Sequence, residues 1–257
     1  MIALLSPAKT LDPGPAHTHL PRTEPRFVAE ACALVTVLRQ LSGADLEKLL
    51  HISPALAQLN HERFLDFSGD AIPSRSKQAA LMYRGDTYKG LDADSLDETD
   101  WPFAQRHVRI LSGLYGLLRP LDAIQPYRLE MATPLVTAAA ANLYAFWSDR
   151  IAKEIDACIA QQSEPQSAYV INLASDEYTR AVAAHALTTP MITPVFKESR
   201  GAKLQVIGLL AKKARGKMAR YLIKNRLCRV EQLRSFNEDG YCFRSDLSDD
   251  NHLVFVR

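Results

Sequence analysis

The sequence lacks the patterns that mark most secreted, membrane-bound and metal-binding proteins. Its four cysteines are scattered and form no Cys-x-x-Cys pair, which is typical of a reduced chain without a disulfide framework. The first apolar run is too short for a signal peptide or a membrane span. No His-Glu-x-x-His motif or Cys/His cluster is present, so we predict neither a metal site nor a cofactor. These absences favour a cytoplasmic protein without a membrane partner.

The chain also lacks a Gly-x-Ser-x-Gly elbow, an obvious Ser/His/Asp set, internal repeats and low-complexity segments. The motifs therefore assign no catalytic residue, and whether the protein is an enzyme stays open. Hydrophobic residues make up 47% of the chain and charged residues 23%, which is ordinary for a globular protein. Because no change in composition is long enough to be a linker, we expect one domain over residues 1–257.

Short apolar runs alternate with segments of helical periodicity. We expect buried strands at the N-terminus and at 169–174, a strand pair at 192–197 and 204–210, and two late strands at 240–244 and 252–256. Helical spacing is clearest at 24–41, 46–52, 142–158 and 212–226, with further helices opening at Ser53 and Ser175. Residues 84–90 are expected to form a loop. This mixture predicts an α+β or mixed α/β fold, with a central mixed sheet surrounded by helices.

Two glycines three residues apart, Gly113 and Gly116, interrupt an apolar stretch that otherwise reads as helix. Because glycine accepts positive φ, the pattern predicts a tight hairpin between two helices. Backbone N–H groups from Gly113 through Leu114 and Tyr115 to Gly116 would then face a phosphate. The alternative is a buried turn between two helices that contacts no ligand.

The C-terminal part is strongly basic. From Ser199 to Val230 there are ten Lys or Arg and no Asp or Glu. Helical spacing places four of these cations on one stripe: Lys213, Lys217, Arg220 and Lys224. A polyanion would relieve their mutual repulsion and release counterions. The alternative is a solvated face that acids elsewhere balance, for example in residues 1–100, which hold 14 Asp or Glu against 10 Lys or Arg.

A second group of polar residues lies where predicted strands end. Ser175 and Glu177 follow the strand at 169–174, and such strand-to-helix junctions commonly hold ligands. The candidate residues for a small-molecule pocket are Lys9, Arg128, Glu130, Asn172, Ser175 and Glu177. The alternative is structural: Ser175 caps a helix, Arg128 and Glu130 form an ion pair, and Lys9 is solvated.

Six of these stretches, taken together, resemble the YaaA family of bacterial peroxide-stress resistance proteins. They are Ser6–Leu11, Leu111–Gly116, Arg119–Asp122, Gln125–Met131, Asn172–Tyr178 and Ala211–Gly216, in the order of the family. The resemblance implies a cytoplasmic protein that limits iron-dependent damage, including DNA damage, under hydrogen peroxide stress. It also implies a mixed α/β fold with a positively charged cleft. A helix-hairpin-helix element that binds double-stranded and branched DNA is implied too, and we place it at Leu111–Asp122.

Two functions follow as hypotheses. The first is a stress protein that binds duplex or branched DNA with little sequence specificity, because no major-groove reading helix is evident. Its predicted contacts are Arg106, Arg109, Gly113, Leu114, Tyr115, Gly116, Arg119, Lys212, Lys213, Arg215, Lys217, Arg220 and Lys224. The second is an enzyme for a nucleotide-like or other small anionic metabolite, with its pocket around Lys9, Arg128 and Asn172. Lys212 belongs to this pocket in the second hypothesis. Direct handling of iron is disfavoured, because few His, Cys or carboxylate groups cluster.

Overall fold

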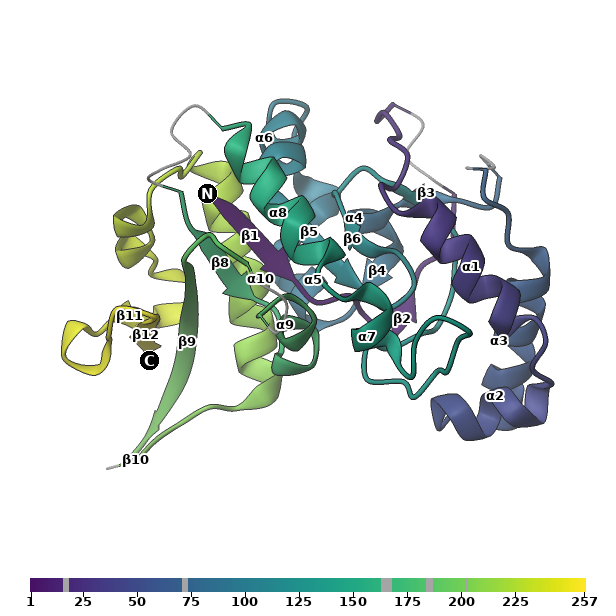
Figure 1. Ribbon diagram of the computed structural model, residues 1–257. Helices are drawn as coiled ribbons and strands as arrows, with labels where there is room; N and C mark the ends of the chain where they lie inside the picture. Colours follow the sequence, from purple (N-terminus) through teal and green to yellow (C-terminus); the bar gives the residue numbers. More distant parts are fainter. Residues whose placement is uncertain (16–18, 71–73, 163–167, 184–186, 202) are drawn as a thin grey trace.

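A central mixed sheet organises the molecule (Figure 1). The computed structural model describes residues 1–15, 19–70, 74–162, 168–183, 187–201 and 203–257. The sheet has the order β11-β12-β9-β8-β1-β5-β6, and β10 pairs with β9 outside this path. Its strands are β1 (Ile2–Leu5), β5 (Val108–Ser112), β6 (Gly116–Leu118), β8 (Val170–Leu173), β9 (Met191–Arg200), β10 (Lys203–Gln205), β11 (Cys242–Phe243) and β12 (His252–Val256). The expected mixed α/β fold with a central mixed sheet is confirmed.

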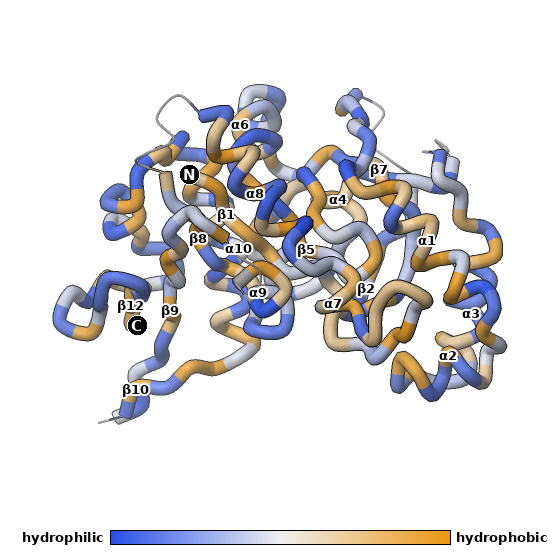
Figure 2. The backbone as a smooth tube through the Cα atoms, in the orientation of Figure 1, coloured by the Kyte–Doolittle hydropathy of each residue, from blue (hydrophilic) through white to orange (hydrophobic). Residues whose placement is uncertain are grey.

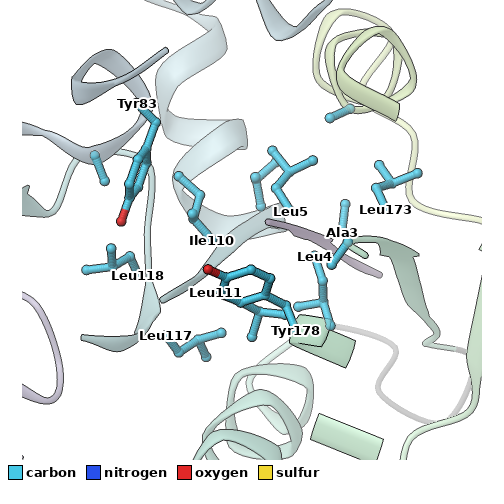
Figure 3. Close-up of a cluster of buried hydrophobic side chains, with 14 of the residues drawn as sticks. Ala3, Leu4, Leu5, Tyr83, Ile110, Leu111, Leu117, Leu118, Leu173 and Tyr178 are labelled. Carbon is cyan, nitrogen blue, oxygen red and sulfur yellow. The ribbon is translucent and has the colours of Figure 1, made fainter. Parts of the chain in front are cut away.

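The middle of the sheet is parallel. β1 pairs in parallel with β5 on one side and β8 on the other, and β8–β9 and β9–β12 are also parallel. All four residues of β1 have no exposed surface, which explains why this strand is a continuous apolar run (Figure 2). Figure 3 shows Leu4 and Leu5 beside Ile110 and Leu173 from the neighbouring strands. The carboxyl ends of β1 and β8 therefore lie together at one edge of the core.

Helices and two small sheets surround this sheet. The helices are α1 (Val28–Leu38), α2 (Gly43–Leu50), α3 (Pro54–Asp66), α4 (Ala79–Met82), α5 (Asp86–Leu91), α6 (Asp100–His107), α7 (Leu143–Trp147), α8 (Arg150–Ala160), α9 (Asp176–Ala183) and α10 (Gly208–Lys224). β2 (Thr10–Leu11) pairs with β4 (Tyr83–Arg84), and β3 (Lys77–Gln78) pairs with β7 (Ala123–Ile124). α10 packs on α5 and along β9, β8 and β1. Among the described residues, no helix is long and apolar enough to cross a membrane.

Three local predictions are wrong. The helix expected at 142–158 is two helices, because Ser148 between α7 and α8 has a φ of 46°. The strand expected at 204–210 ends at Gln205, and α10 begins at Gly208. The loop expected at 84–90 is mostly helical, because α5 begins at Asp86. The last difference matters most, because α5 lines the candidate site.

The predicted hairpin between two helices at Gly113 is also wrong: the stretch is a buried β-hairpin that joins β5 to β6. Gly116 has a φ of 66°, and a Cβ there would lie 2.6 Å from the Trp147 ring. The N–H groups of Leu114 and Tyr115 donate to Ser112 Oγ, at 3.2 and 2.9 Å. Because these groups are buried and already bonded, they do not form the predicted phosphate site.

Candidate functional site

A cavity of about 300 Å³ lies where β1 and β8 end. Ser6 follows β1 and Ser175 follows β8, and the Ser175 N–H donates to Ser6 Oγ at 2.9 Å. The two hydroxyl oxygens are 3.3 Å apart. β5 and β8 flank β1 on opposite sides, so the strand order changes direction at β1. Open α/β sheets hold ligands at such a point, beyond the carboxyl ends of the strands. We call this space the strand-end cavity.

One wall of the strand-end cavity comes from the crossing of α5 and α10. Gly90 and Gly216 lie in the contact, and a Cβ on Gly90 would be 2.2 Å from the Lys213 carbonyl oxygen. Only glycine at these positions lets the two backbones come so close. The crossing carries Thr87 from α5 and Arg215 from α10 to the same cavity. The signals of this wall in the sequence are the glycines at 85, 90 and 216.

A second wall is the segment that follows β7. Lys9 Nζ lies 2.6 Å from Glu130 Oε2, and Arg128 Nη2 lies 3.2 Å from Glu130 Oε1. A Cβ on Gly113 would lie 2.4 Å from the Leu129 carbonyl oxygen. The glycine of the β-hairpin therefore makes room for this segment, and so positions the Arg128 and Glu130 side chains.

Arg215 is the most unusual residue of the cavity. Burial lowers the pKa of its guanidinium, because the charged form loses hydration. Its Nε is buried and has no hydrogen-bond acceptor among the described residues, and the same is true of Arg128 Nε. A buried charged donor without a partner costs free energy. Two such donors in one cavity favour an anionic ligand.

Tyrosines form the floor of the cavity. Tyr88 donates its hydroxyl to the Ser6 carbonyl oxygen at 3.1 Å. The Tyr127 hydroxyl lies 2.6 Å from both Tyr83 Oη and Ser112 Oγ, and burial raises the pKa of Tyr127 to about 12. Burial raises the pKa of Tyr88 as well, so both tyrosines are neutral at physiological pH, and their rings give the floor an apolar character.

The structure brings five of the six predicted pocket residues together. They are Lys9, Arg128, Glu130, Ser175 and Glu177, all of which line the strand-end cavity. Glu177 Oε1 accepts from the Ala132 N–H at 3.1 Å. Asn172 lies outside the lining. Its Oδ1 accepts from the Ala174 N–H and from Thr179 Oγ1, so it ties the end of β8 to α9.

Several cavity residues were not predicted for this site. Arg84, Asp86 and Thr87 line it from β4 and α5. Arg215, which we assigned only to DNA, lines it from α10 beside Lys212, which both hypotheses named. Helical periodicity alone places these two cations on α10, but it does not show that α5 brings a partner wall to them.

The basic stripe is neutralised by acids from elsewhere in the fold. Its ion pairs join Lys213 and Lys217 to Asp239, Arg220 to Asp92, and Lys224 to Asp97 and Asp100. Three of these four acids belong to residues 1–100, as the alternative interpretation expected. The stripe is therefore not a row of unpaired charges.

A second hollow, of about 910 Å³, lies at the opposite ends of β1 and β5. Five arginines line it, and no Asp or Glu is among its described lining residues: Arg106, Arg109, Arg119, Arg226 and Arg229. Arg109 is 6% exposed, and its guanidinium donates to the carbonyl oxygens of Gln105 and Val108. Arg109 thus builds the wall, while Arg106 and Arg229 are exposed. We call this space the arginine hollow.

Comparison with known proteins gives the family. The family model described as peroxide stress protein YaaA matches residues 1–247. The chain belongs to the YaaA peroxide-stress family. A UPF0246 protein of Caulobacter vibrioides is 48% identical over 257 residues, which is 100% of this chain and 99% of that protein. A UPF0246 protein of Burkholderia orbicola is 46% identical over 261 residues, with 100% and 98% of the two chains covered. The expected family is thereby confirmed, and with it a place in peroxide stress.

Proposed function

We propose that this YaaA-family protein serves in peroxide stress by binding a small, nucleotide-like anionic metabolite in the strand-end cavity. Arg215 is the observation that carries the proposal. Its guanidinium is largely withdrawn from water, and its Nε has no acceptor among the described residues. A ligand anion satisfies that donor and offsets the cost of its burial.

The charge of the cavity supports the same conclusion. Five cations and three carboxylates line it: Lys9, Arg84, Arg128, Lys212 and Arg215 against Asp86, Glu130 and Glu177. Arg84 already forms ion pairs with Asp12 and Asp94, which lie outside the cavity lining. Neither Lys212 nor Arg215 forms a salt bridge with a described residue, and the charge of Asp176 raises the pKa of Arg215 by less than burial lowers it. The cavity therefore has positive charge without a direct salt bridge on α10, on the side where the buried donor lies.

The size of the cavity fits a metabolite better than a nucleic acid. About 300 Å³ is at the lower end of small-molecule sites. An apolar tyrosine floor below charged walls is also the usual composition of such sites. Lys9, Glu130 and Glu177 supply groups of the kind used in acid–base chemistry, so we extend the proposal to an enzyme acting on the bound anion.

Titration calorimetry with a panel of nucleotides and other small phosphates tests binding. Loss of one charged hydrogen bond is expected to weaken a bound anion about tenfold or more in Arg215→Gln. Lys212→Gln is expected to weaken it less, because Lys212 is exposed. The matched control is Arg200→Gln, an exposed arginine at the end of β9. Equal affinities in Arg215→Gln and the wild type would overturn the proposal.

A second candidate function is binding of duplex or branched DNA with little sequence specificity. The arginine hollow favours it, because five arginines and no described carboxylate line it. Arg119 and Arg226 already pair with Asp122 and Asp100. Arginine contacts phosphate oxygens bidentately, and such contacts carry no base specificity. In this form of the hypothesis, Arg106 and Arg229 contact the DNA phosphates, in place of the β-hairpin and the basic stripe.

We place either activity in the cytoplasm. The cysteines are free thiols, and Cys228 and Cys242 are exposed. Exposed thiols persist in a reducing compartment and are oxidised outside it.

A further inference from the structure

Glu130 forms ion pairs with Lys9 and Arg128, two cations that an anionic ligand in the cavity would need. Its two carboxylate oxygens are divided between Lys9 and Arg128, at 2.6 and 3.2 Å. The Glu130 side chain is 25% exposed and the Arg128 side chain 19%. A protein carboxylate thus neutralises one side of the strand-end cavity, while Arg215 remains on the other side.

The backbone of Glu130 is held in place. The Thr133 N–H donates to the Glu130 carbonyl oxygen at 3.1 Å. The backbone at Leu129 and Glu130 also packs directly on Gly113, where a Cβ would lie 3.1 Å from the Glu130 carbonyl carbon. Only the side chain of Glu130 is therefore free to leave its two cations when another anion arrives.

We propose that Glu130 is a specificity-determining residue, which restricts the strand-end cavity to dianions of the phosphate-monoester class. This inference rests on the proposed function of the cavity. A ligand carboxylate that displaces Glu130 replaces one monoanion by another and gains little. A phosphate monoester has a charge near −2 and three terminal oxygens, so it has the charge to replace Glu130 at Lys9 and Arg128 and an acceptor left for Arg215.

The competing interpretation is a structural ion pair that only fixes the segment around Arg128. The two interpretations predict opposite effects of removing Glu130 on the affinity for an anion. If Glu130 competes with the ligand, its removal strengthens anion binding, because Lys9 and Arg128 become available. If Glu130 is structural, its removal loosens Arg128 and weakens binding.

The test compares two probes with the same ring, phenyl phosphate and benzoate, by titration calorimetry. In the wild type, phenyl phosphate is expected to bind more tightly than benzoate. In Glu130→Gln, phenyl phosphate affinity is expected to rise about three- to tenfold, since the competing contacts are partly exposed ion pairs. Benzoate affinity is expected to rise more, so the selectivity for the phosphate falls.

Glu177→Gln is the matched control, because it removes the same charge from the same cavity but no contact to Lys9 or Arg128. It is expected to raise both affinities, that of the dianion at least as much as that of the monoanion, so the selectivity for the phosphate does not fall. Thermal unfolding of each variant checks that the fold is intact.

Three outcomes would overturn the inference. If Glu130→Gln keeps the wild-type selectivity or weakens phosphate binding, while Arg215→Gln weakens phosphate binding about tenfold or more, the inference fails and the proposed function stands. If Glu177→Gln lowers the selectivity as much as Glu130→Gln does, the effect does not come from the ion pairs of Glu130, and Glu130 is no specific determinant. If neither the wild type nor Glu130→Gln binds either probe, both the inference and the proposed function fail.

Discussion

Gly216 on α10 crosses Thr87 on α5 so closely that a Cβ on Gly216 would lie 1.8 Å from the Thr87 carbonyl oxygen. The residue before Gly216 is Arg215, and both Thr87 and Arg215 line the strand-end cavity. The distance between the two helices therefore sets the distance between Thr87 and Arg215 within this wall of the cavity. A residue without a side chain defines the geometry of the site.

Substitution of this glycine is expected to destabilise the protein. Gly216→Ala forces the two backbones apart, and such overpacking costs about 1–3 kcal/mol or more of the free energy of unfolding. Gly208→Ala in the same helix is the control, because nothing lies within 4 Å of a Cβ there. It is expected to be neutral or slightly stabilising. Denaturant unfolding measures both, and equal stabilities would contradict the close crossing.

The β-hairpin glycine allows a similar comparison. Gly116 and Gly201 have similar positive φ values, 66° and 62°, but only Gly116 faces an obstacle, the Trp147 ring. Gly201→Ala is expected to cost about 1 kcal/mol from backbone strain alone. Gly116→Ala is expected to cost this plus about 1–3 kcal/mol for the clash. Thermal melts of the two variants with the same loss of stability would contradict the packing of Trp147 against the turn.

Much of the framework was predictable from local patterns. The apolar runs at β1 and β8 indicated buried strands, and Ser175 with Glu177 indicated a helix start at the end of a strand. Because the carboxyl ends of parallel strands meet at one edge of a sheet, five of the six predicted pocket residues do line one cavity. Those predictions needed only periodicity and strand direction.

The parts that were not predictable depend on tertiary contacts. The stretch 108–118 is apolar on every side, because it is buried on both faces of the sheet, so its periodicity did not separate strand from helix. The basic stripe is visible in the sequence, but its partners Asp92, Asp97 and Asp100 lie more than a hundred residues away. The helix α5 has only six residues, too few for a periodic signal.

Acid sensitivity should depend on Asp12. Hydrogen bonds from Arg84 and Lys77 hold the pKa of Asp12 well below its ordinary value of 3.8. A carboxyl group with a lowered folded-state pKa stabilises the protein above its unfolded-state pKa, and this contribution is lost as the pH falls below about 4. Asp12→Asn is expected to lower stability at neutral pH, since the Lys77 side chain is only 5% exposed.

The same variant is also expected to flatten the decline of unfolding free energy between about pH 4 and pH 2. Urea unfolding across this range measures the effect. Asp250→Asn, at an exposed aspartate, is the control. An unchanged pH profile in Asp12→Asn would show that its bonds to Arg84 and Lys77 do not form in solution.

For DNA, the structure distinguishes the arginine hollow from the basic stripe. Each phosphate contact adds about 0.9 to the slope of log affinity against log salt. Replacement of both Arg106 and Arg229 by Gln is expected to reduce the slope by about two. Replacement of both Lys213 and Lys217 by Gln is expected to leave it nearly unchanged, because both already pair with Asp239. Fluorescence anisotropy with a duplex and a four-way junction measures it, and the reverse result would restore the stripe as the DNA surface.

The central claim is that the strand-end cavity is an anion site built around Arg215. Anomalous diffraction from crystals soaked in tungstate, a phosphate-like dianion with a strong signal, tests it most directly. The account predicts a tungstate peak in the cavity within hydrogen-bond distance of Arg215 Nε, and its loss in crystals of Arg215→Gln. Tungstate bound elsewhere on the protein, with no peak in this cavity, would contradict it.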